Sequence, residues 1–563
     1  MAFWHVLCDP IAMIFIGCKA ARAAVAWIGI GWLAGRLLAG DVPLGHVLWL
    51  QGVDGSLPVP GFKIDGTLRL EAIDEPLDVG LIIGPGRVTN STTGRITVKP
   101  GPGGARYVVG PVLNFGEIDV DLINLSWYGD GRCENHSVIK LSGYAGFGFY
   151  GPETVLDLEE GAIIQADPRT GYVWVQDGRF LFNGGTVDFP VYVARGSASV
   201  GTGATNPIAI NFVGPGCLYD GIIPANCALR LLAEDRFPPL ALTLTNAPRL
   251  DGAVHVDRQT SASPMALKLA AGGLFVSTHG TMTIANGGPG IRVTGNLTNA
   301  GNIMQSGPME LSGDLPVVNA GSWTVAEGAS LTVATPWIQT GGVLVLDGGK
   351  ITAPAGLTLS GGDLSGTGAI IGSVSNRAAV TLVRNQPLAV TGDWTQGDTG
   401  SLGIKVASDD LSPDAAALRI DGRLVLSGPL VVTADAPIKW SPGQAVTIVS
   451  ATELSGWFTD VQMPVLPDGM HWTLEPSGNV YRFVTSTHSP ALQLSGQYGD
   501  TNISLTLYGA PGTGLVVERS TRLDGWQTVT NQGRFTGLAR FEVLGTDAPE
   551  QWFRARYTPA SGR

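Results

Sequence analysis

Charged residues and cysteines are scarce in this chain of 563 residues. Only 15% of the residues are charged, and Asp and Glu outnumber Lys and Arg by 47 to 35, which leaves a net charge of −12. Because binding a phosphate backbone requires a clustered positive face, nucleic acid is excluded as a partner. The five cysteines include no Cys-x-x-Cys pair and no Cys/His spacing that would hold zinc.

Several catalytic motifs are also missing. The sequence contains no Gly-x-Ser-x-Gly, no His-Glu-x-x-His, no EF-hand loop and no Walker phosphate loop. A single Gly-x-Gly-x-x-Gly occurs from Gly146 to Gly151, but Pro152 follows and no helical pattern opens there. It is therefore a glycine-rich turn and not a dinucleotide site.

Glycine, in contrast, is abundant at 79 residues, and some of these glycines lie in a short sequence repeat, which we call the phrase. The phrase returns at a nearly constant interval, as Asn299-Ala-Gly-Asn-Ile, Asn319-Ala-Gly-Ser-Trp, Gln339-Thr-Gly-Gly-Val and Ser360-Gly-Gly-Asp-Leu. The segments between the glycines alternate apolar and polar residues, as strands do. A fixed period of about 20 residues predicts one coil of a stacked β-solenoid.

We therefore predict an all-β fold, a right-handed parallel β-helix followed by a small C-terminal β-sandwich. The hand rests on the general preference for right-handed connections, and a constant period over residues 42–465 would make roughly 20 coils. We interpret the asparagines as turn residues that also form hydrogen bonds along the stack.

The expected domains are residues 1–40 as an N-terminal signal or anchor, 41–485 as the β-helix (irregular over 41–290, regular over 291–392, closing coils over 393–485) and 489–563 as the sandwich.

The first forty residues predict export. Lys19 and Arg22 precede a thirteen-residue apolar stretch, residues 23–35, and small residues follow at Ala39 and Gly40. This order is typical of a secretory signal, with translation starting at Met1 or at Met13. The alternative is an uncleaved membrane anchor, for which the stretch is short. We expect an extracellular or cell-surface protein that contacts the membrane only through this segment.

Three cysteines lie outside the leader. Cys217 and Cys227 flank a short segment that could close as a disulfide in an oxidising compartment, and Cys133 is then left over.

Acidic residues are the only candidates for a catalytic site. Asp119 and Asp121 flank Val120, so in a strand both carboxylates point to the same side. Further acidic groups are Glu153, Asp157, Glu159 and Glu160, and Asp409, Asp410 and Asp414. Polysaccharide lyases and hydrolases with a β-helix fold use such carboxylates, assisted by calcium or a basic residue. Two-residue spacing of acids is also an ordinary solvated strand face, so we assign no catalytic residue; calcium is the one cofactor that this pattern would suit.

The segment from Asp393 to Phe483 resembles the closing coils of autotransporter-type passenger β-helices. The resemblance rests, in order, on Trp394-Thr-Gln-Gly, Gly400 to Val406, Leu418 to Val432, Gly443 to Val449 and Leu454 to Phe458. Ala415 to Ala417 replace the Asp and aromatic residue that the pattern has before Leu418. The segment that follows Phe483 is too short for a translocating barrel, so the resemblance implies the passenger alone.

The C-terminal residues predict a separate unit, because alternating strands recur about every dozen residues. Val517 to Trp526 and Trp552 to Arg556 resemble an end module of secreted β-solenoid proteins of Verrucomicrobia and Planctomycetes, with Arg522 where that pattern has Asp. The resemblance implies a module that caps the solenoid. We expect Trp526 and Phe553 in its core, and glycan binding by Trp526 or Trp552 is the alternative.

Two functions are compatible with these patterns. The first is a monomeric, secreted or cell-surface β-solenoid with a structural, adhesive or glycan-binding role, whose partners are polysaccharides or components of the cell surface or matrix. The second is a polysaccharide lyase or hydrolase that uses carboxylates between Asp119 and Asp257, where insertions in irregular coils could shape a cleft.

Overall fold

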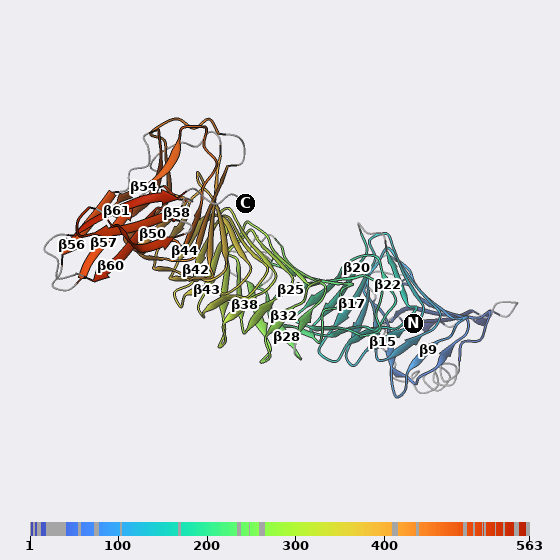
Figure 1. Ribbon diagram of the computed structural model, residues 1–563. Coiled ribbons are helices and arrows are strands. Elements are labelled where there is room, and N and C mark those ends of the chain that lie inside the picture. Colours follow the sequence, from blue (N-terminus) through green and yellow to red (C-terminus); the bar gives the residue numbers. More distant parts are fainter. Residues whose placement is uncertain are drawn as a thin grey trace. The chain divides into compact units, whose positions relative to one another are not determined.

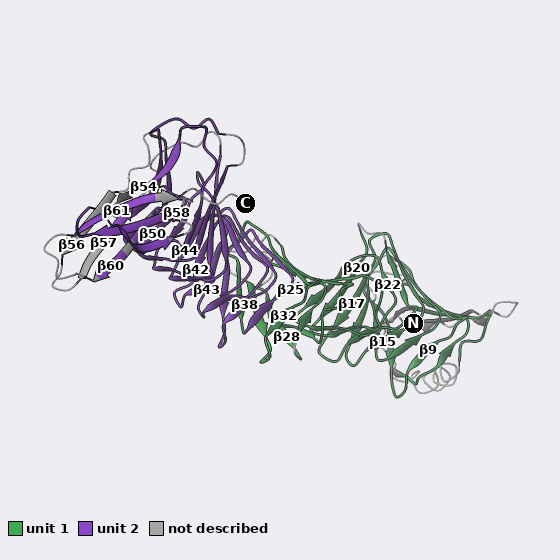
Figure 2. Ribbon diagram, in the orientation of Figure 1, with its two compact units in different colours: residues 1–295 green, residues 296–563 purple. Residues whose placement is uncertain are grey.

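The computed structural model shows an all-β protein, a parallel β-solenoid of about 15 turns with no helix among the described residues (Figure 1). This confirms the predicted fold class. The structure describes residues 2–3, 6–7, 13–18, 41–53, 58–72, 78–101, 104–166, 170–233, 238–246, 248–257, 265–407, 415–434, 438–487, 493–498, 502–508, 510–511, 514–523, 525–532, 535–544 and 551–558. The chain divides into two compact units, residues 1–295 and 296–563 (Figure 2).

In the first unit most coils contribute one strand to each of three parallel columns. The first column contains β4 (Val47–Val53), β7 (Thr67–Leu70), β10 (Arg95–Val98), β13 (Glu117–Asp121), β16 (Val138–Ser142) and β19 (Ile163–Ala166). The second contains β8 (Val79–Ile83), β11 (Arg106–Val109), β14 (Leu125–Tyr128), β17 (Gly146–Tyr150), β20 (Tyr172–Gln176), β23 (Val191–Ala194) and β25 (Ile208–Val213). The third contains β9 (Val88–Asn90), β12 (Val112–Asn114), β15 (Arg132–Asn135), β18 (Val155–Leu158), β21 (Arg179–Phe182), β24 (Ser197–Val200) and β26 (Cys217–Asp220).

The strands are in register, so apolar side chains stack inside the coils. Leu68, Ile96 and Ile118 are aligned in successive strands of the first column, and all three are buried. Because side chains alternate along a strand, their neighbours face outward. Each column therefore presents an outer face whose composition is independent of the core.

The coils of the first unit differ in length. The coil that leads from Val79 to its aligned partner Arg106 is long, whereas the coil that leads from Val173 to its aligned partner Val191 is short. The expectation of roughly 20 coils assumed a constant period and is too high, because long coils use more residues per turn.

The N-terminal residues are described only in part. Strand β3 (Met13–Cys18) pairs in parallel with β4. The apolar stretch of the predicted signal, residues 23–35, lies outside the described residues, so the signal or anchor stays a prediction.

In the second unit the repeated phrase stacks on itself. Asn299 at the end of β35 (Leu297–Asn299) is aligned with Asn319 at the end of β38 (Val317–Asn319), which is aligned with Gln339 at the end of β41 (Trp337–Gln339). All three side chains are fully buried. The Asn299 amide donates to Asn319 Oδ1 at 2.7 Å, and the Asn319 amide donates to Gln339 Oε1 at 2.7 Å. This amide ladder confirms the structural interpretation of the asparagines.

A second amide ladder occupies the third column of the first unit. Asn90 donates to Asn114, and Asn114 donates to Asn135, both at 2.6 Å. The ladder ends where Asn135 donates to the carbonyl of Ser137 at 2.9 Å. Buried amides thus satisfy one another from coil to coil, although the coil lengths here are irregular.

The glycine of the phrase is required by the close approach of successive turns. A Cβ atom on Gly321 would lie 2.2 Å from the carbonyl oxygen of Gly301. No side chain fits in that space, so glycine recurs at this turn because the stacked backbones nearly touch.

The parallel order ends in an antiparallel hairpin. Strand β55 (Val480–Ser486) pairs antiparallel with β52 (Ala445–Gly456) and with β54 (His471–Ser477). The hairpin covers part of the edge of β52, which would otherwise expose unpaired backbone groups.

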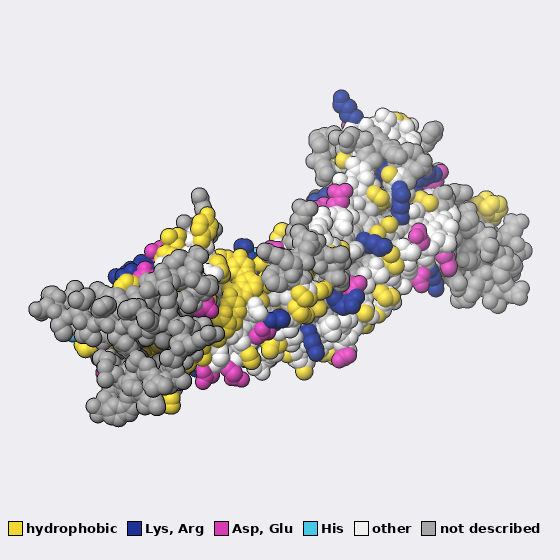
Figure 3. All heavy atoms as spheres, turned by 180° about the vertical axis from the view of Figure 1, so that it is seen from behind, with side chains coloured by type: hydrophobic (Ala, Val, Ile, Leu, Met, Phe, Trp, Pro, Cys, Tyr) yellow, Lys and Arg dark blue, Asp and Glu magenta, His cyan; other side chains and the backbone are white. Residues whose placement is uncertain are grey.

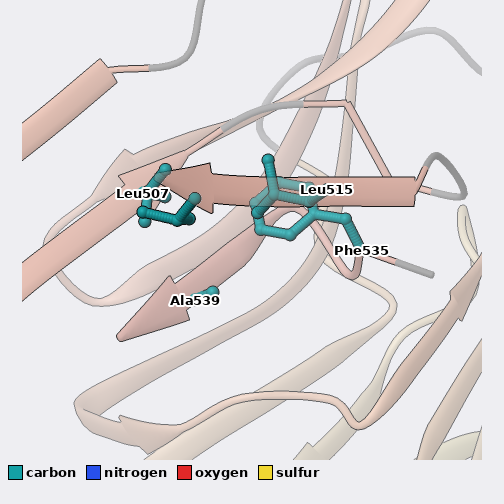
Figure 4. Close-up of a cluster of buried hydrophobic side chains, with 5 residues drawn as sticks. Leu507, Leu515, Phe535 and Ala539 are labelled. Atoms are coloured by element: carbon teal, nitrogen blue, oxygen red, sulfur yellow. The ribbon is translucent and has the colours of Figure 1, made fainter. Parts of the chain in front are cut away.

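Two three-stranded antiparallel sheets follow. One contains β56 (Gln493–Tyr498), β57 (Asn502–Tyr508) and β60 (Leu538–Leu544), and the other contains β59 (Gln527–Gln532), β58 (Gly514–Ser520) and β61 (Trp552–Thr558). Both sheets contribute to a buried cluster of Leu507, Leu515, Val517, Phe535 and Ala539 (Figure 4). The β-sandwich itself stays a prediction. Trp526, which was expected in the core, is not part of this cluster; its ring is half-buried, and the guanidinium of Arg554 lies over it at 4.3 Å.

Candidate functional site

The outer face of the first column carries the predicted acidic pair. Asp119 and Asp121 both face outward from β13, as their spacing predicts. Asp119 contacts Arg95 of β10 at 3.1 Å and Lys99 at 3.7 Å, and Asp121 contacts Lys99 at 3.2 Å. Glu117, at the start of β13, is likewise placed between cations, at 3.0 Å from both Arg95 and Lys140.

These contacts make Asp119 and Asp121 members of a network of ion pairs across three coils. Each carboxylate faces a cation of a neighbouring coil, so the charges of adjacent coils attract one another across the stack. On the face seen in Figure 3, basic and acidic side chains are likewise interspersed among the coloured residues. The geometry supports a structural role for this pair; catalysis by it stays untested.

A second group of charged residues lies on the third column. Asp157 of β18 is 1% exposed, although its neighbour Glu134 in the preceding coil faces outward. The guanidinium of Arg132 donates to Asp157 Oδ2, and the amide of Asn183 donates to Asp157 Oδ1 at 2.9 Å. His136 bonds Glu134 at 2.9 Å and stacks on Phe115 with ring centroids 4.8 Å apart.

The surroundings of Asp157 favour its protonated form. Burial raises the pKa of the Asp157 carboxyl, and the charge of Glu159 raises it further, while Arg132 opposes both effects. A raised carboxyl pKa is typical of a general acid. However, both oxygens of Asp157 are bonded to protein groups and the side chain is almost fully covered, so it does not present a reactive atom to a substrate in this arrangement.

The pH dependence of the unfolding free energy should reveal the raised pKa of Asp157. Because its pKa is raised in the folded state, the folded protein binds this proton more tightly than the unfolded chain does, and stability from this group falls as the pH rises above the ordinary Asp value of about 4. We expect the unfolding free energy of the wild type, relative to Asp157→Asn, to decrease with rising pH in that window. Denaturant unfolding at a series of pH values measures it. Replacing the exposed Glu153 with Gln is the control. An equal pH dependence of the wild type relative to Glu153→Gln would contradict the assignment to Asp157.

The Cys217–Cys227 disulfide expected from the sequence is not formed in the structure, which has both residues as free, buried thiols. Cys217 begins β26, and its Sγ lies 3.4 Å from the carbonyl oxygen of Val213. Cys227 begins β27 (Cys227–Leu232), which extends the second column, whereas β26 belongs to the third. Cys227 interacts with Tyr219. Burial raises the pKa of both thiols, and of the Cys133 thiol, so none is a reactive nucleophile.

The outer face of the second column is aromatic. Its outward rings are half-buried except for Tyr128, which is 41% exposed. Tyr128 is aligned with Tyr150 and Trp174 with Tyr192 in the following coils. The ring centroids are 5.4 Å apart for Tyr128 and Tyr150 and 5.8 Å apart for Trp174 and Tyr192, and both pairs are stacked. We name this surface the aromatic strip; it comprises Tyr107, Tyr128, Tyr150, Tyr172, Trp174 and Tyr192.

Outward-facing glycines make room for the rings. A Cβ atom on Gly80 would lie 2.1 Å from the ring of Tyr107, and one on Gly146 would lie 2.4 Å from the ring of Tyr172. Each of these glycines is aligned with its tyrosine in the next coil, so the ring leans over the preceding coil. Burial raises the pKa of the Tyr150 phenol, and the neighbouring phenols of Tyr172 and Tyr128 raise it further. The rings of the strip are therefore closely packed, and the Tyr150 phenol is held in its neutral form.

The sequence analysis did not find the aromatic strip. Its signal is present, because Tyr107, Tyr128, Tyr150 and Tyr172 follow one another at intervals close to the coil period. Recognising them as neighbours requires the register of the irregular coils. The strip lies between Asp119 and Asp257 for the most part, where a site was expected, but it contains aromatic rings and no carboxylate.

Among the described residues, no three His, Cys, Asp or Glu side chains lie together so as to hold a metal ion. Asp409, Asp410 and Asp414 lie outside the described residues. Calcium binding therefore stays a prediction. A polar hollow of about 180 Å³ lies beside Arg519 and Arg522, which is small for a ligand pocket. In the described part of the chain no helix is long and apolar enough to cross a membrane.

Comparisons with known proteins do not assign this chain to a family. A scan against models of protein families finds none that matches this chain, and a search of curated proteins finds no match either. The class of protein is thus defined by the fold: a parallel β-solenoid with a packed aromatic strip on one outer face.

Proposed function

We propose that this protein is a secreted or cell-surface β-solenoid that binds glycan through the aromatic strip. The observation that supports it is the gathering of six aromatic side chains on one outward face, of which Tyr128 and Tyr150, and Trp174 and Tyr192, are aligned in register, while glycines make room for several of the rings. Aromatic rings gathered on a solvent-facing surface are typical of an interaction site. Export by the N-terminal segment and kinship with autotransporter passengers or bacterial end modules are part of the same proposal and rest on the sequence patterns alone.

The chemistry of the strip suits sugars. The face of an aromatic ring carries partial negative charge, and the C–H groups on one side of a pyranose ring carry partial positive charge, so the two attract while apolar surface is removed from water. Phenol and indole groups at the ring edges can bond sugar hydroxyls. Rings that are already packed lose little conformational entropy on binding.

Removing two central rings should abolish most of the binding. We expect the double variant Tyr128→Ala and Tyr150→Ala to bind glycan at least about ten-fold more weakly than the wild type, because centrally placed aromatic residues carry most of the energy of an interface. Binding is measured by affinity electrophoresis and calorimetry on a panel of neutral and acidic polysaccharides. The control is Phe275→Ala, which removes an aromatic residue that is 41% exposed on β32 (Leu274–Val276), outside the strip.

Two results would overturn or redirect the proposal. Equal binding by the double variant and the control, or no binding of the wild type to any polysaccharide, contradicts it. Release of reducing ends or of unsaturated sugars during the same incubations would instead favour the polysaccharide-active enzyme as the function.

A further inference from the structure

We infer that the ligand of the aromatic strip is a neutral, linear polysaccharide of pyranoses that lies along the stacking direction of the coils, with about one sugar ring per coil. This inference rests on the proposed function and adds the charge, the shape and the orientation of the ligand. It is carried by the composition of one outer face and by the sequence of rings from coil to coil.

The outer face that carries the strip has no charged side chain over seven successive strands. The outward positions of β8, β11, β14, β17, β20, β23 and β25 are occupied by Gly80, Ile82, Tyr107, Val109, Ser126, Tyr128, Gly146, Gly148, Tyr150, Tyr172, Trp174, Gln176, Tyr192, Ala194, Ala209, Asn211 and Val213. The uncharged face ends at Arg230 of β27, which is aligned with Asn211. The first column of the same coils, in contrast, carries the ion-pair network of Arg95, Lys99, Asp119 and Asp121. Of these two columns, only the first carries charge at its outward strand positions; the ion pair of Asp177 and Arg195 lies just past the ends of β20 and β23.

This segregation selects against acidic glycans. A uronic acid polymer requires Arg, Lys or a bound cation to compensate its carboxylates, and the outward positions of the strip offer none. The chain as a whole has a net charge of −12, which repels a polyanion over the Debye length of the solution. A neutral sugar needs only apolar ring surface and hydroxyl partners, which this face provides.

The order of the rings from coil to coil determines the direction in which the ligand lies. Centroids are 6.3 Å apart from Tyr107 to Tyr128 and 5.4 Å apart from Tyr128 to Tyr150, which follows the coil spacing of about 4.8 Å. Tyr150 lies over Gly148, and Gly148 is aligned with Trp174 in the next coil, so the rings follow one another from coil to coil. The rings come from five successive strands but from only three adjacent outward rows, so the contact surface extends mainly in the stacking direction. A linear chain fits this shape, and a branched or compact ligand does not.

Polar groups beside the rings complete the site. Trp174 Nε1 donates to Gln176 Oε1 at 3.4 Å, which leaves the Gln176 amide for a ligand hydroxyl.

The test uses oligosaccharides of increasing length on the full-length protein. Cello-oligosaccharides of two to six units are the neutral probe, and hexagalacturonate is the acidic probe of the same length. We expect the dissociation constant of cellohexaose to be at least about ten-fold lower than that of cellotriose, because each further ring occupies another coil. Binding should change little with salt, since no ion pair forms, and hexagalacturonate should bind at least about ten-fold more weakly than cellohexaose.

Variants at both ends of the strip locate the ligand. Tyr107→Ala and Tyr192→Ala should each weaken cellohexaose by about three-fold to ten-fold and leave cellobiose nearly unchanged, because only the long ligand reaches both ends. Circular dichroism shows whether each variant retains its β-structure. Equal affinity for all chain lengths would overturn the orientation along the coils.

The outcomes separate the two proposals. If hexagalacturonate binds more tightly than cellohexaose and the strip variants weaken it, the neutral ligand class is wrong while glycan binding by the strip stands. If neither probe binds, or if binding is unaffected by any strip variant, the proposed function fails together with this inference.

Discussion

Replacing Trp323 with alanine is expected to lower the free energy of unfolding by about 3–5 kcal/mol, the usual cost of deleting a buried indole. Trp323 lies on β39 (Ser322–Ala326), is fully buried and is aligned with Ile303 in the preceding coil and Leu344 in the following one. Its ring meets Trp337 edge-on, with centroids 4.7 Å apart. Because hydrogen-bonded coils above and below prevent the site from collapsing, a cavity remains.

Denaturant unfolding followed by far-ultraviolet circular dichroism measures this loss without relying on the fluorescence of the deleted residue. The matched control is Met304→Ala on β36 (Asn302–Gln305), which faces outward and is 50% exposed. Its expected cost is within about 0.5 kcal/mol. A similar loss in both variants would show that packing inside this coil does not determine its stability.

Replacing Asn319 with leucine is expected to cost about 2–5 kcal/mol, although the two side chains are similar in size, because each buried group left unsatisfied costs about 1–3 kcal/mol. The substitution removes the acceptor of the Asn299 amide and the donor to the Gln339 carbonyl, and both partners are fully buried. Leucine is tolerated one coil beyond Gln339, at Leu359 of β43 (Leu357–Leu359), because the Gln339 amide turns away to the carbonyl of Gly341.

The sequence of the column supplies the control for this prediction. Glutamine already occupies the equivalent position one coil later, so Asn319→Gln retains a donor and an acceptor on a longer side chain. We expect it to cost about 1 kcal/mol, from overpacking alone. Denaturant unfolding of both variants decides the point: equal destabilisation by leucine and by glutamine would mean that the side-chain volume, and not the hydrogen-bond ladder, sets the requirement at this position.

Much of the second unit could be predicted because its period is nearly constant. Residues one period apart, such as Asn299 and Asn319, are direct neighbours when every coil has the same length, so the sequence alone indicates both the coil and the amide ladder. The all-β class follows from alternation between glycine turns. The interpretation of asparagine as structural succeeded for the same reason.

The candidate site could not be predicted in this way. Two-residue spacing correctly places Asp119 and Asp121 on one side of a strand, but their partners Arg95 and Lys99 come from another coil of different length. Spacing suggested a disulfide between Cys217 and Cys227, whereas the two begin strands of different columns. The aromatic strip was missed because its tyrosines are adjacent only through the register.

A β-solenoid with glycine turns, an inward apolar stripe and buried amides can be derived from the amino-acid order alone, since these features follow from local alternation and from a short repeat. Which residues of successive, unequal coils meet on the outer faces of the first unit is visible only in the folded chain. Hydrogen bonding between parallel strands sets the register, while turns of variable length absorb the extra residues, so the spacing along the chain does not give these neighbours. The charged face and the aromatic strip are products of that register.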